Sequence, residues 1–237
     1  ILSHGIPQTD PFSFTAAGKH WVTHEWLAEV LLYLIYKIAG IAGLIFFKGA
    51  ISALIAFLIY RFGTKKGASA ALSAAVAMLT VAAMSYMIYA RPHAFTFLFL
   101  ALLCMILFDQ SPRGRTMRWL ILPAIFLLWA NMHAGFILGL AVYWIVVIRE
   151  ILSKSEPTFA ARFKRFGYPA IFATLICLLN PSGYEIFYYP ILISMTPAFK
   201  SSIAEWVSPV YLGKQEWLAL GILGLEATGP AEGPGKK

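Results

Sequence analysis

Charged side chains are scarce in this sequence. Only 13% of its 237 residues are Asp, Glu, Lys or Arg, whereas 59% are hydrophobic and the mean hydropathy is +0.72. An ordinary soluble domain carries about 25% charged and roughly 45–50% apolar residues. The composition therefore excludes water as the main solvent of the chain and favours an integral membrane protein.

Cysteine is also rare, with two residues in the whole chain. Cys104 and Cys177 each lie within an apolar stretch and lack the spacing of metal ligands. This context is typical of small buried hydrophobes and favours that interpretation over a disulfide or a metal site.

Acidic residues are few, and 19 Lys and Arg against 11 Asp and Glu give a net charge of +8. The cations occur in short runs between long apolar segments, not along one polar face. Nucleic-acid binding needs such a face, so we exclude nucleic acid as a partner and expect membrane lipid instead.

Neither a start Met nor a signal peptide is recognisable before the first polar loop. We therefore expect the chain to begin partway through a protein. The tail from Glu226 to Lys237 is rich in Gly, Pro and charge, so we expect it to be flexible.

Six apolar segments predict an all-α fold, a polytopic bundle of transmembrane helices. They are Ile41 to Phe62, Ala68 to Ala90, His93 to Phe108, Trp119 to Asn131, Gly135 to Ile148 and Phe166 to Leu179. The first two reach the ~20 residues that cross a bilayer, and the later four need flanking residues or local thinning. We expect an outer loop with an amphipathic helix (1–40), a six-span core (41–180), an outer interfacial segment (181–215), and a partial span with the tail (216–237).

The connections between these spans differ sharply in charge. Alternate connections on one side contain eleven cations: Arg61, Lys65, Lys66, Arg113, Arg115, Arg118, Arg149, Lys154, Arg162, Lys164 and Arg165. The connections on the other side contain only Arg91. The positive-inside rule predicts a multi-pass protein with the eleven-cation side in the cytoplasm and the Arg91 side on the non-cytoplasmic face.

Two interfacial segments are expected on that outer side. Thr23 is a candidate cap for an amphipathic helix that continues through Trp26 and ends near Gly40. The aromatic, proline-containing segment Tyr184 to Met195 is the second. Trp217 to Leu225 resembles a further span cut short.

Most chemically capable side chains belong to the outer connections, including four of the five histidines. The collected residues are Asp10, His20, His24, Glu25, Arg91, His93, Asn131, His133, Asn180, Glu205 and Trp206. Ionisable groups at a membrane are costly unless they serve a purpose, so their clustering indicates a site.

Each candidate has a structural alternative. Asp10 precedes Pro11 and fits an Asx turn as well as a catalytic role. His24 and Glu25 fit either a solvated cap pair or the lining of a cleft that faces Asp10. Arg91 and His93 fit either loop hydrogen bonds or the binding of a lipid-linked phosphate.

Three further sites remain open in the same way. Asn131 and His133 form a corner similar to that at Arg91, and a divalent metal ion held by histidines is an alternative there. The Asn180 to Tyr184 segment is foremost a turn that stops a helix. Glu205 and Trp206 combine a carboxylate with an aromatic plane, as sugar recognition requires.

The segment Thr9-Asp10-Pro11-Phe12-Ser13-Phe14-Thr15, with Gly18, Trp21 and His24-Glu25-Trp26-Leu27, resembles a known family. It is similar to bacterial C-type membrane glycosyltransferases grouped with protein O-mannosyltransferases and lipid A sugar transferases, over roughly Ile1 to Pro209. The resemblance implies that a first span is missing, that Asp10 is the catalytic base and that Arg91 contacts the donor phosphate. It also implies a protein of the bacterial inner membrane whose site faces the periplasm or exterior.

The resulting hypothesis is sugar transfer from a polyprenyl phosphate donor to an acceptor hydroxyl at the outer face. His93 would assist Arg91 at the phosphate, and the substrate would contact His24, Glu25, Asn131, His133, Glu205 and Trp206. The alternative is a non-catalytic, glycosyltransferase-like subunit fixed among membrane protein partners. A transporter is disfavoured, because we find neither an inverted repeat nor charges at the bilayer midplane.

Overall fold

A computed structural model of the chain describes residues 1–2, 5–15, 17–84, 91–109, 111–153 and 158–196. All regular elements in these ranges are helical, apart from an isolated bridge between Thr9 and His20. The all-α prediction is therefore confirmed. The partial span at Trp217 to Leu225 and the tail lie outside the described residues.

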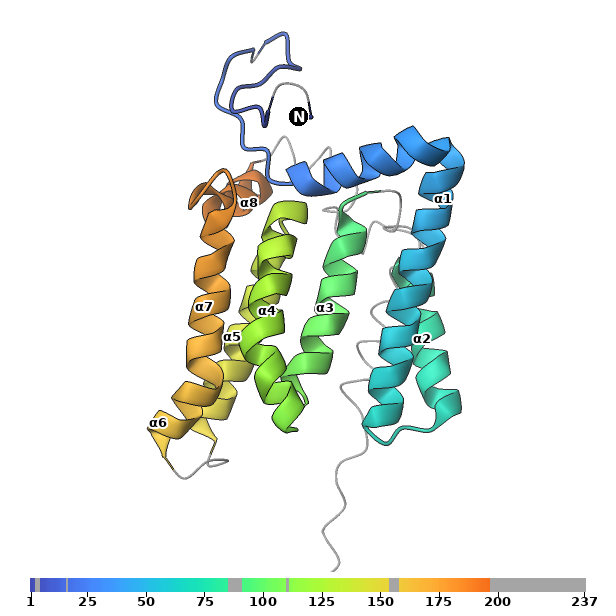
Figure 1. Ribbon diagram of the computed structural model, residues 1–237, viewed down its shortest axis with the longest axis vertical. Coiled ribbons are helices and arrows are strands. Elements are labelled where there is room, and N and C mark those ends of the chain that lie inside the picture. Colours follow the sequence, from blue (N-terminus) through green and yellow to red (C-terminus); the bar gives the residue numbers. More distant parts are fainter. Residues whose placement is uncertain (3–4, 16, 85–90, 110, 154–157, 197–237) are drawn as a thin grey trace, which may run out of the picture.

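The helices form an upright bundle with two elements across one end (Figure 1). In chain order they are α1 (Trp26–Lys65), α2 (Ala70–Met84), α3 (His93–Leu107), α4 (Pro112–Met132), α5 (Phe136–Leu152), α6 (Phe159–Arg162), the π-helix η1 (Phe163–Gly167), α7 (Tyr168–Ile176), the 3₁₀ turn η2 (Cys177–Leu179) and α8 (Glu185–Met195). The first half of α1 and all of α8 lie across the top in Figure 1. We call that end, where α3 begins and α4 finishes, the upper end.

One described helix, α1, is both long and apolar enough to cross a membrane. Three shorter apolar helices are Ala70–Met84, His93–Leu107 and Glu185–Met195. Each of the six predicted spans overlaps a helix, and residues 85–90 of the second lie outside the described residues. The fourth and sixth helical segments are longer than the spans predicted for them. The fourth begins at Pro112, after the Ser111 side chain accepts from Gly114 N, and helix runs without a break from Phe159 to Leu179. Side-chain caps set these starts within charged sequence, where apolarity gave no signal.

Gly40 turns α1 through the corner between its two halves. Its φ of 60° and ψ of −151° are non-helical, while helix continues on both sides. Only glycine adopts this region without strain, because it has no Cβ. The predicted end near Gly40 is thus a change of direction. The cap prediction for Thr23 was wrong, since its hydroxyl donates to Pro7 O at 2.8 Å instead.

An aromatic stack fills the core between α3, α4 and α5. Trp129 is fully buried, with ring centroids 5.6 Å from both Phe99 and Phe126, and Phe126 stacks on Tyr143 at 6.0 Å. Gly139 of α5 faces the Trp129 ring, and a Cβ there would overlap it. Small residues allow such close approach of helices, so the stack fixes how α5 packs on α4.

We expect Gly40→Ala to destabilise the fold by about 1–3 kcal/mol, because alanine is strained in this backbone region. Gly49 lies in the same helix, and a Cβ there would meet open space. Gly49→Ala should instead stabilise by about 0.5–1 kcal/mol. Unfolding of both variants in detergent provides the comparison, and equal stability of the two would contradict the assigned role of Gly40.

Candidate functional site

Side chains from three corners meet at the upper end and form what we call the histidine–glutamate cluster: His24, Glu25, His93 and His133. The Glu25 Oε1 atom lies 3.4 Å from His133 Nε2 and 3.6 Å from His24 Nε2. The His93 and His133 rings stand 4.3 Å apart between centroids. Residues far apart in sequence are therefore gathered around one carboxylate.

The orientation of His133 follows from its hydrogen bonds. Gly135 N–H donates to His133 Nδ1 at 2.9 Å, and the Thr96 hydroxyl lies 2.7 Å from the same nitrogen. The Trp129 indole N–H donates to Thr96 Oγ1 at 3.0 Å, which leaves the Thr96 hydrogen to point at His133. Because two donors address Nδ1, we assign the His133 proton to Nε2, which faces Glu25.

Gly135 is needed for this arrangement. A Cβ at residue 135 would collide with Thr96 Oγ1 and come within 2.9 Å of His133 Nδ1. The glycine lets the chain pass close to the imidazole, so its N–H reaches the ring two residues earlier. The motif His133-Ala134-Gly135 is thus a single structural unit.

The pKa values of the two histidines beside Glu25 are shifted in opposite directions. Burial lowers the pKa of His133 to about 4, so this ring is neutral at pH 7. Burial also opposes charge on His24, but the hydrogen bond and charge of Glu25 outweigh it and raise the pKa of His24. Burial would raise the pKa of Glu25, yet interaction with His24 and the other imidazoles lowers it. Glu25 is therefore an ionised carboxylate, and its interaction with His24 favours the protonated form of that imidazole.

A second network holds the first half of α1 on the bundle. Trp26 Nε1 donates to Asn131 Oδ1 at 2.7 Å, and Asn180 Nδ2 donates to Ala130 O at 2.9 Å and Asn131 Oδ1 at 3.2 Å. Asn131 Nδ2 in turn donates to Leu127 O. The predicted substrate contact of Asn131 stays untested, and its amide is engaged in positioning Glu25 through Trp26.

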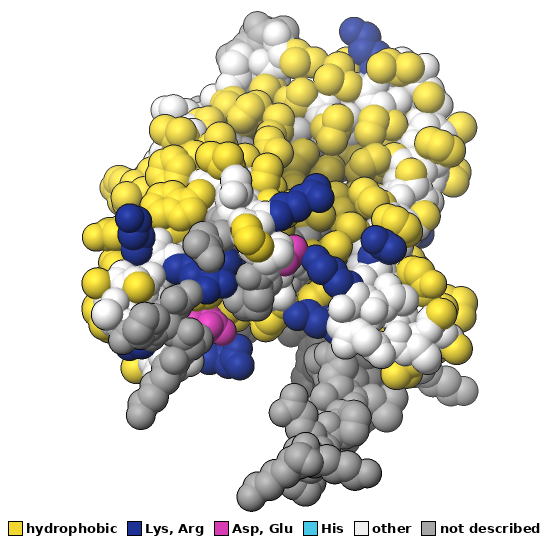
Figure 2. Space-filling model, turned by 60° about the horizontal axis from the view of Figure 1, so that its bottom comes forward, with side chains coloured by type: hydrophobic (Ala, Val, Ile, Leu, Met, Phe, Trp, Pro, Cys, Tyr) yellow, Lys and Arg dark blue, Asp and Glu magenta, His cyan; other side chains and the backbone are white. Residues whose placement is uncertain are grey.

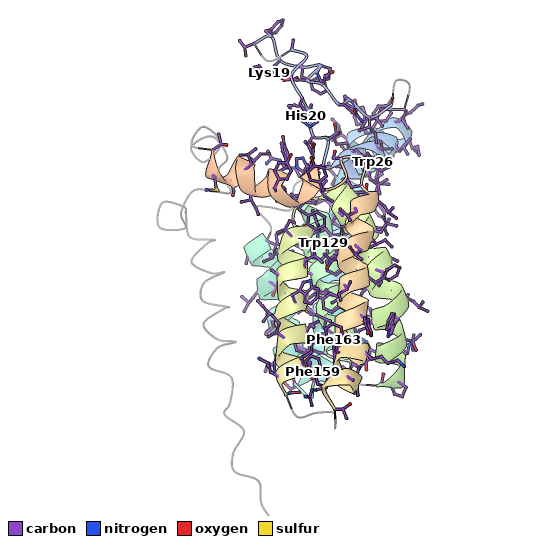
Figure 3. The ribbon with its side chains drawn as sticks, turned by 90° about the vertical axis from the view of Figure 1, so that its left-hand side faces the viewer. Lys19, His20, Trp26, Trp129, Phe159 and Phe163 are labelled. Carbon is purple, nitrogen blue, oxygen red and sulfur yellow. The ribbon has the colours of Figure 1, made fainter. Side chains whose placement is uncertain are left out.

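Asp10 lies on a loop that extends away from the bundle, and Figure 3 shows the neighbouring Lys19 and His20 on it. Asp10 Oδ1 accepts from Phe12 N at 2.8 Å and Ser13 N at 3.0 Å. The hydrogen bonds from Ser13 and Phe12 lower the pKa of Asp10. The Asx-turn alternative is therefore present, and a catalytic role for Asp10 stays a prediction.

His93 and Arg91 occupy the start of α3 at the same end. His93 Nδ1 is buried and has no hydrogen-bond partner among the described residues. Buried polar atoms are nearly always paired, so this nitrogen is available to a bound ligand. Arg91 is exposed two residues earlier.

The remaining predictions have mixed outcomes. Within the described ranges, no three His, Cys, Asp or Glu side chains are arranged to hold a metal ion. Glu205 and Trp206 lie outside the described residues. His20 contacts α8 through Glu185 at 2.7 Å.

Sequence reasoning missed Thr96 and Trp129, which orient His133 from within the core. Thr96 is one turn after His93 inside an otherwise apolar segment. A hydroxyl at that spacing was the available signal.

Comparison with known proteins found no matching family model, no matching curated protein and no matching solved structure.

The low pKa of His133 predicts an acid-sensitive fold. Because its folded value of about 4 lies below the unfolded 6.5, the unfolded chain binds the proton first. The contribution of His133 to the free energy of unfolding is therefore complete above pH 6.5 and is lost as the pH falls towards 4. The loss amounts to about 2–3 kcal/mol. Unfolding between pH 7.5 and 4.5 measures it.

His133→Asn is the matched variant, because the Asn Oδ1 can still accept from Gly135 and Thr96. It should be less stable at pH 7.5 but show a flatter acid profile. If the variant instead showed the same dependence of stability on pH as the wild type, the acid sensitivity would belong to another group, such as Asp10 or Glu25.

Replacing Thr96 tests the chain from Trp129 to His133. Thr96→Val keeps the shape but leaves the buried Trp129 N–H without an acceptor, at a cost of about 1–3 kcal/mol. Thr96→Ser keeps the hydroxyl and loses one methyl, at about 1 kcal/mol. Thermal unfolding should rank Ser above Val, and the reverse order would contradict the hydrogen-bond chain.

Proposed function

We propose that this chain is a polytopic membrane protein that transfers a sugar from a lipid phosphate to an acceptor hydroxyl at its upper end. The observation that carries the proposal is the histidine–glutamate cluster, an ionised carboxylate held among three imidazoles. The comparisons add nothing for or against it, so support comes from the site and from the surface.

The outer surface of the bundle supports a membrane setting. Large apolar side chains are exposed on α1, α4, α5 and α7: Ile45, Phe46, Phe57, Leu120, Ile145 and Leu175 are each more than half exposed. Soluble proteins rarely leave such contiguous apolar surface in water. Lipid would cover these side chains, and the excess of cations at the lower end agrees with the positive-inside rule.

Sugar transfer makes two demands on the site. The acceptor hydroxyl loses its proton to a base while its oxygen bonds to the anomeric carbon. The bond from that carbon to the phosphate oxygen breaks, and its electron pair leaves with the lipid phosphate. A carboxylate meets the first demand, and donors to the phosphate meet the second.

Glu25 suits the role of base better than Asp10. Its carboxylate is partly buried beside His24 and His133, whereas Asp10 Oδ1 caps two backbone amides of its own turn. His133 presents Nε2–H to Glu25 and so fixes the direction of the carboxylate. The base predicted from the family resemblance was Asp10, so the two carboxylates are rival assignments.

The donor phosphate is assigned to the start of α3. The unpaired His93 Nδ1 is one donor when protonated, and Arg91 adds a guanidinium at the same end. Arg91 and His93 are far from Glu25 in the sequence. The His93 ring contacts the His133 ring, and His133 in turn faces Glu25. Base and phosphate group would then flank one substrate.

Glu25→Gln should reduce transfer by about 10²–10⁴-fold, because the amide cannot take the proton. Asp10→Asn should reduce it by less than about tenfold, since Asn Oδ1 preserves the turn's hydrogen bonds. The full protein in liposomes is assayed for release of polyprenyl phosphate from a panel of polyprenyl-phosphate sugars, with unfolding midpoints as the fold control.

The opposite ranking would return the base to Asp10. Full activity of both variants would remove both carboxylates from the mechanism. Absence of transfer by the wild type, together with stoichiometric membrane partners on purification, would favour the non-catalytic subunit.

A further inference from the structure

A cavity of about 660 Å³ opens at the lower end of the bundle, opposite the histidine–glutamate cluster. It lies between the end of α1, the end of α3 and the start of α4, and its lining includes Arg61, Lys65 and Arg113. Figure 2 shows Lys and Arg side chains gathered over this end, beside a broad apolar surface. The volume is within the range of about 300–1,000 Å³ for small-molecule sites.

The cavity carries an excess of positive charge. Its acidic lining residue, Asp109, is 2.8 Å from Lys65 Nζ and accepts from Ser111 N at 3.0 Å. The hydrogen bonds from Lys65 and Ser111 hold the pKa of Asp109 well below its usual range, so Asp109 stays ionised. It therefore neutralises Lys65 and leaves Arg61 and Arg113 for a ligand.

Neither arginine is committed elsewhere in the part of the chain that the structure describes. No ion pair joins the guanidinium of Arg61 or Arg113 to another described residue, and both side chains are exposed. By contrast, Lys66 nearby donates to Phe108 O at 2.9 Å and lies over the Phe62 and Phe108 rings. Planar guanidinium groups match the geometry of phosphate oxygens, with two parallel hydrogen bonds each.

Part of the cavity lining and the nearby helix surface are apolar. Met105, Ile106 and Met117 line the cavity together with the cations. On the same helices, Phe57 of α1 and Leu120 of α4 are exposed further along. A free inorganic anion gains nothing from apolar surface, whereas a phospholipid needs it beside its headgroup. The arrangement favours a lipid as the source of the phosphate.

We propose that this cavity binds the phosphate of an anionic phospholipid, with Arg61 and Arg113 as its ligands and the acyl chains lying along α1 and α4. The inference rests on the membrane part of the proposed function and is independent of sugar transfer.

The full chain, extracted from the membrane fraction in a neutral detergent, is titrated with phosphatidylglycerol while its thermal unfolding midpoint is followed. Phosphatidylglycerol should raise the midpoint by several degrees, and phosphatidylcholine should not. In the double variant Arg61→Gln/Arg113→Gln, the concentration for half the effect should rise at least about tenfold.

The control double variant is Arg149→Gln/Lys164→Gln. It also removes two exposed cations from helix segments near the lower end, but neither residue lines the cavity. It should retain the wild-type response. An equal loss in both double variants would overturn the proposal in favour of general surface charge.

Two further measurements decide the ligand. Asp109→Asn removes the competing anion while Asn can still accept from Ser111, so phosphatidylglycerol should act at a lower concentration. An unchanged or higher concentration would count against the cavity. Stabilisation by 10 mM inorganic phosphate equal to that by phosphatidylglycerol would overturn the lipid assignment.

Discussion

The hydrogen bond from the Trp129 indole to Thr96 joins the core of this protein to its candidate site. The indole is fully buried in the aromatic stack, and its N–H must find an acceptor there. Thr96 accepts it and thereby turns its own hydrogen towards His133. The direction of His133, and with it the environment of Glu25, is therefore set by packing between α3, α4 and α5.

The two ends of the bundle handle charge differently. At the upper end, the partly buried Glu25 carboxylate contacts imidazoles that come from separate corners of the chain. At the lower end, Arg118 is fully buried, donates to Ile106 O and Asp109 O, and lies 4.9 Å over the Phe166 ring. That cation ties the end of α3 to α4 and η1, while exposed arginines remain at the surface.

Long apolar segments and the charge asymmetry of their connections were enough to predict the helical segments and to place the corners at His93 and His133 at one end. The predicted span boundaries were wrong where a helix starts within charged sequence, as at Pro112. A Ser cap and a polar first turn do not stand out in hydropathy, so apolar segments alone do not show such a start. For Asp10 the sequence left two alternatives open, an Asx turn and a catalytic role, because Asp before Pro fits both.

The site itself was only partly predictable. The histidines and Glu25 were identified by their position in outer connections, but their mutual contacts depend on long-range packing that spacing does not encode. Thr96 and Trp129 are typical core residues by sequence, and their role emerges only when α3 and α4 are side by side. Glu205 and Trp206 lie beyond the described residues, so their predicted sugar contact stays untested.

The corner at Gly40 directs the first half of α1 across the upper end of the bundle. From Trp26 to Gly40 the helix spans about 22 Å at ~1.5 Å per residue, and this segment delivers the carboxylate of Glu25 across the tops of the other helices. The rotation of this segment about its own axis matters as well, because one inserted residue would rotate its first turn by about 100°. An insertion between Trp26 and Gly40 would therefore move Glu25 away from His133, although loops at a protein surface commonly tolerate insertions.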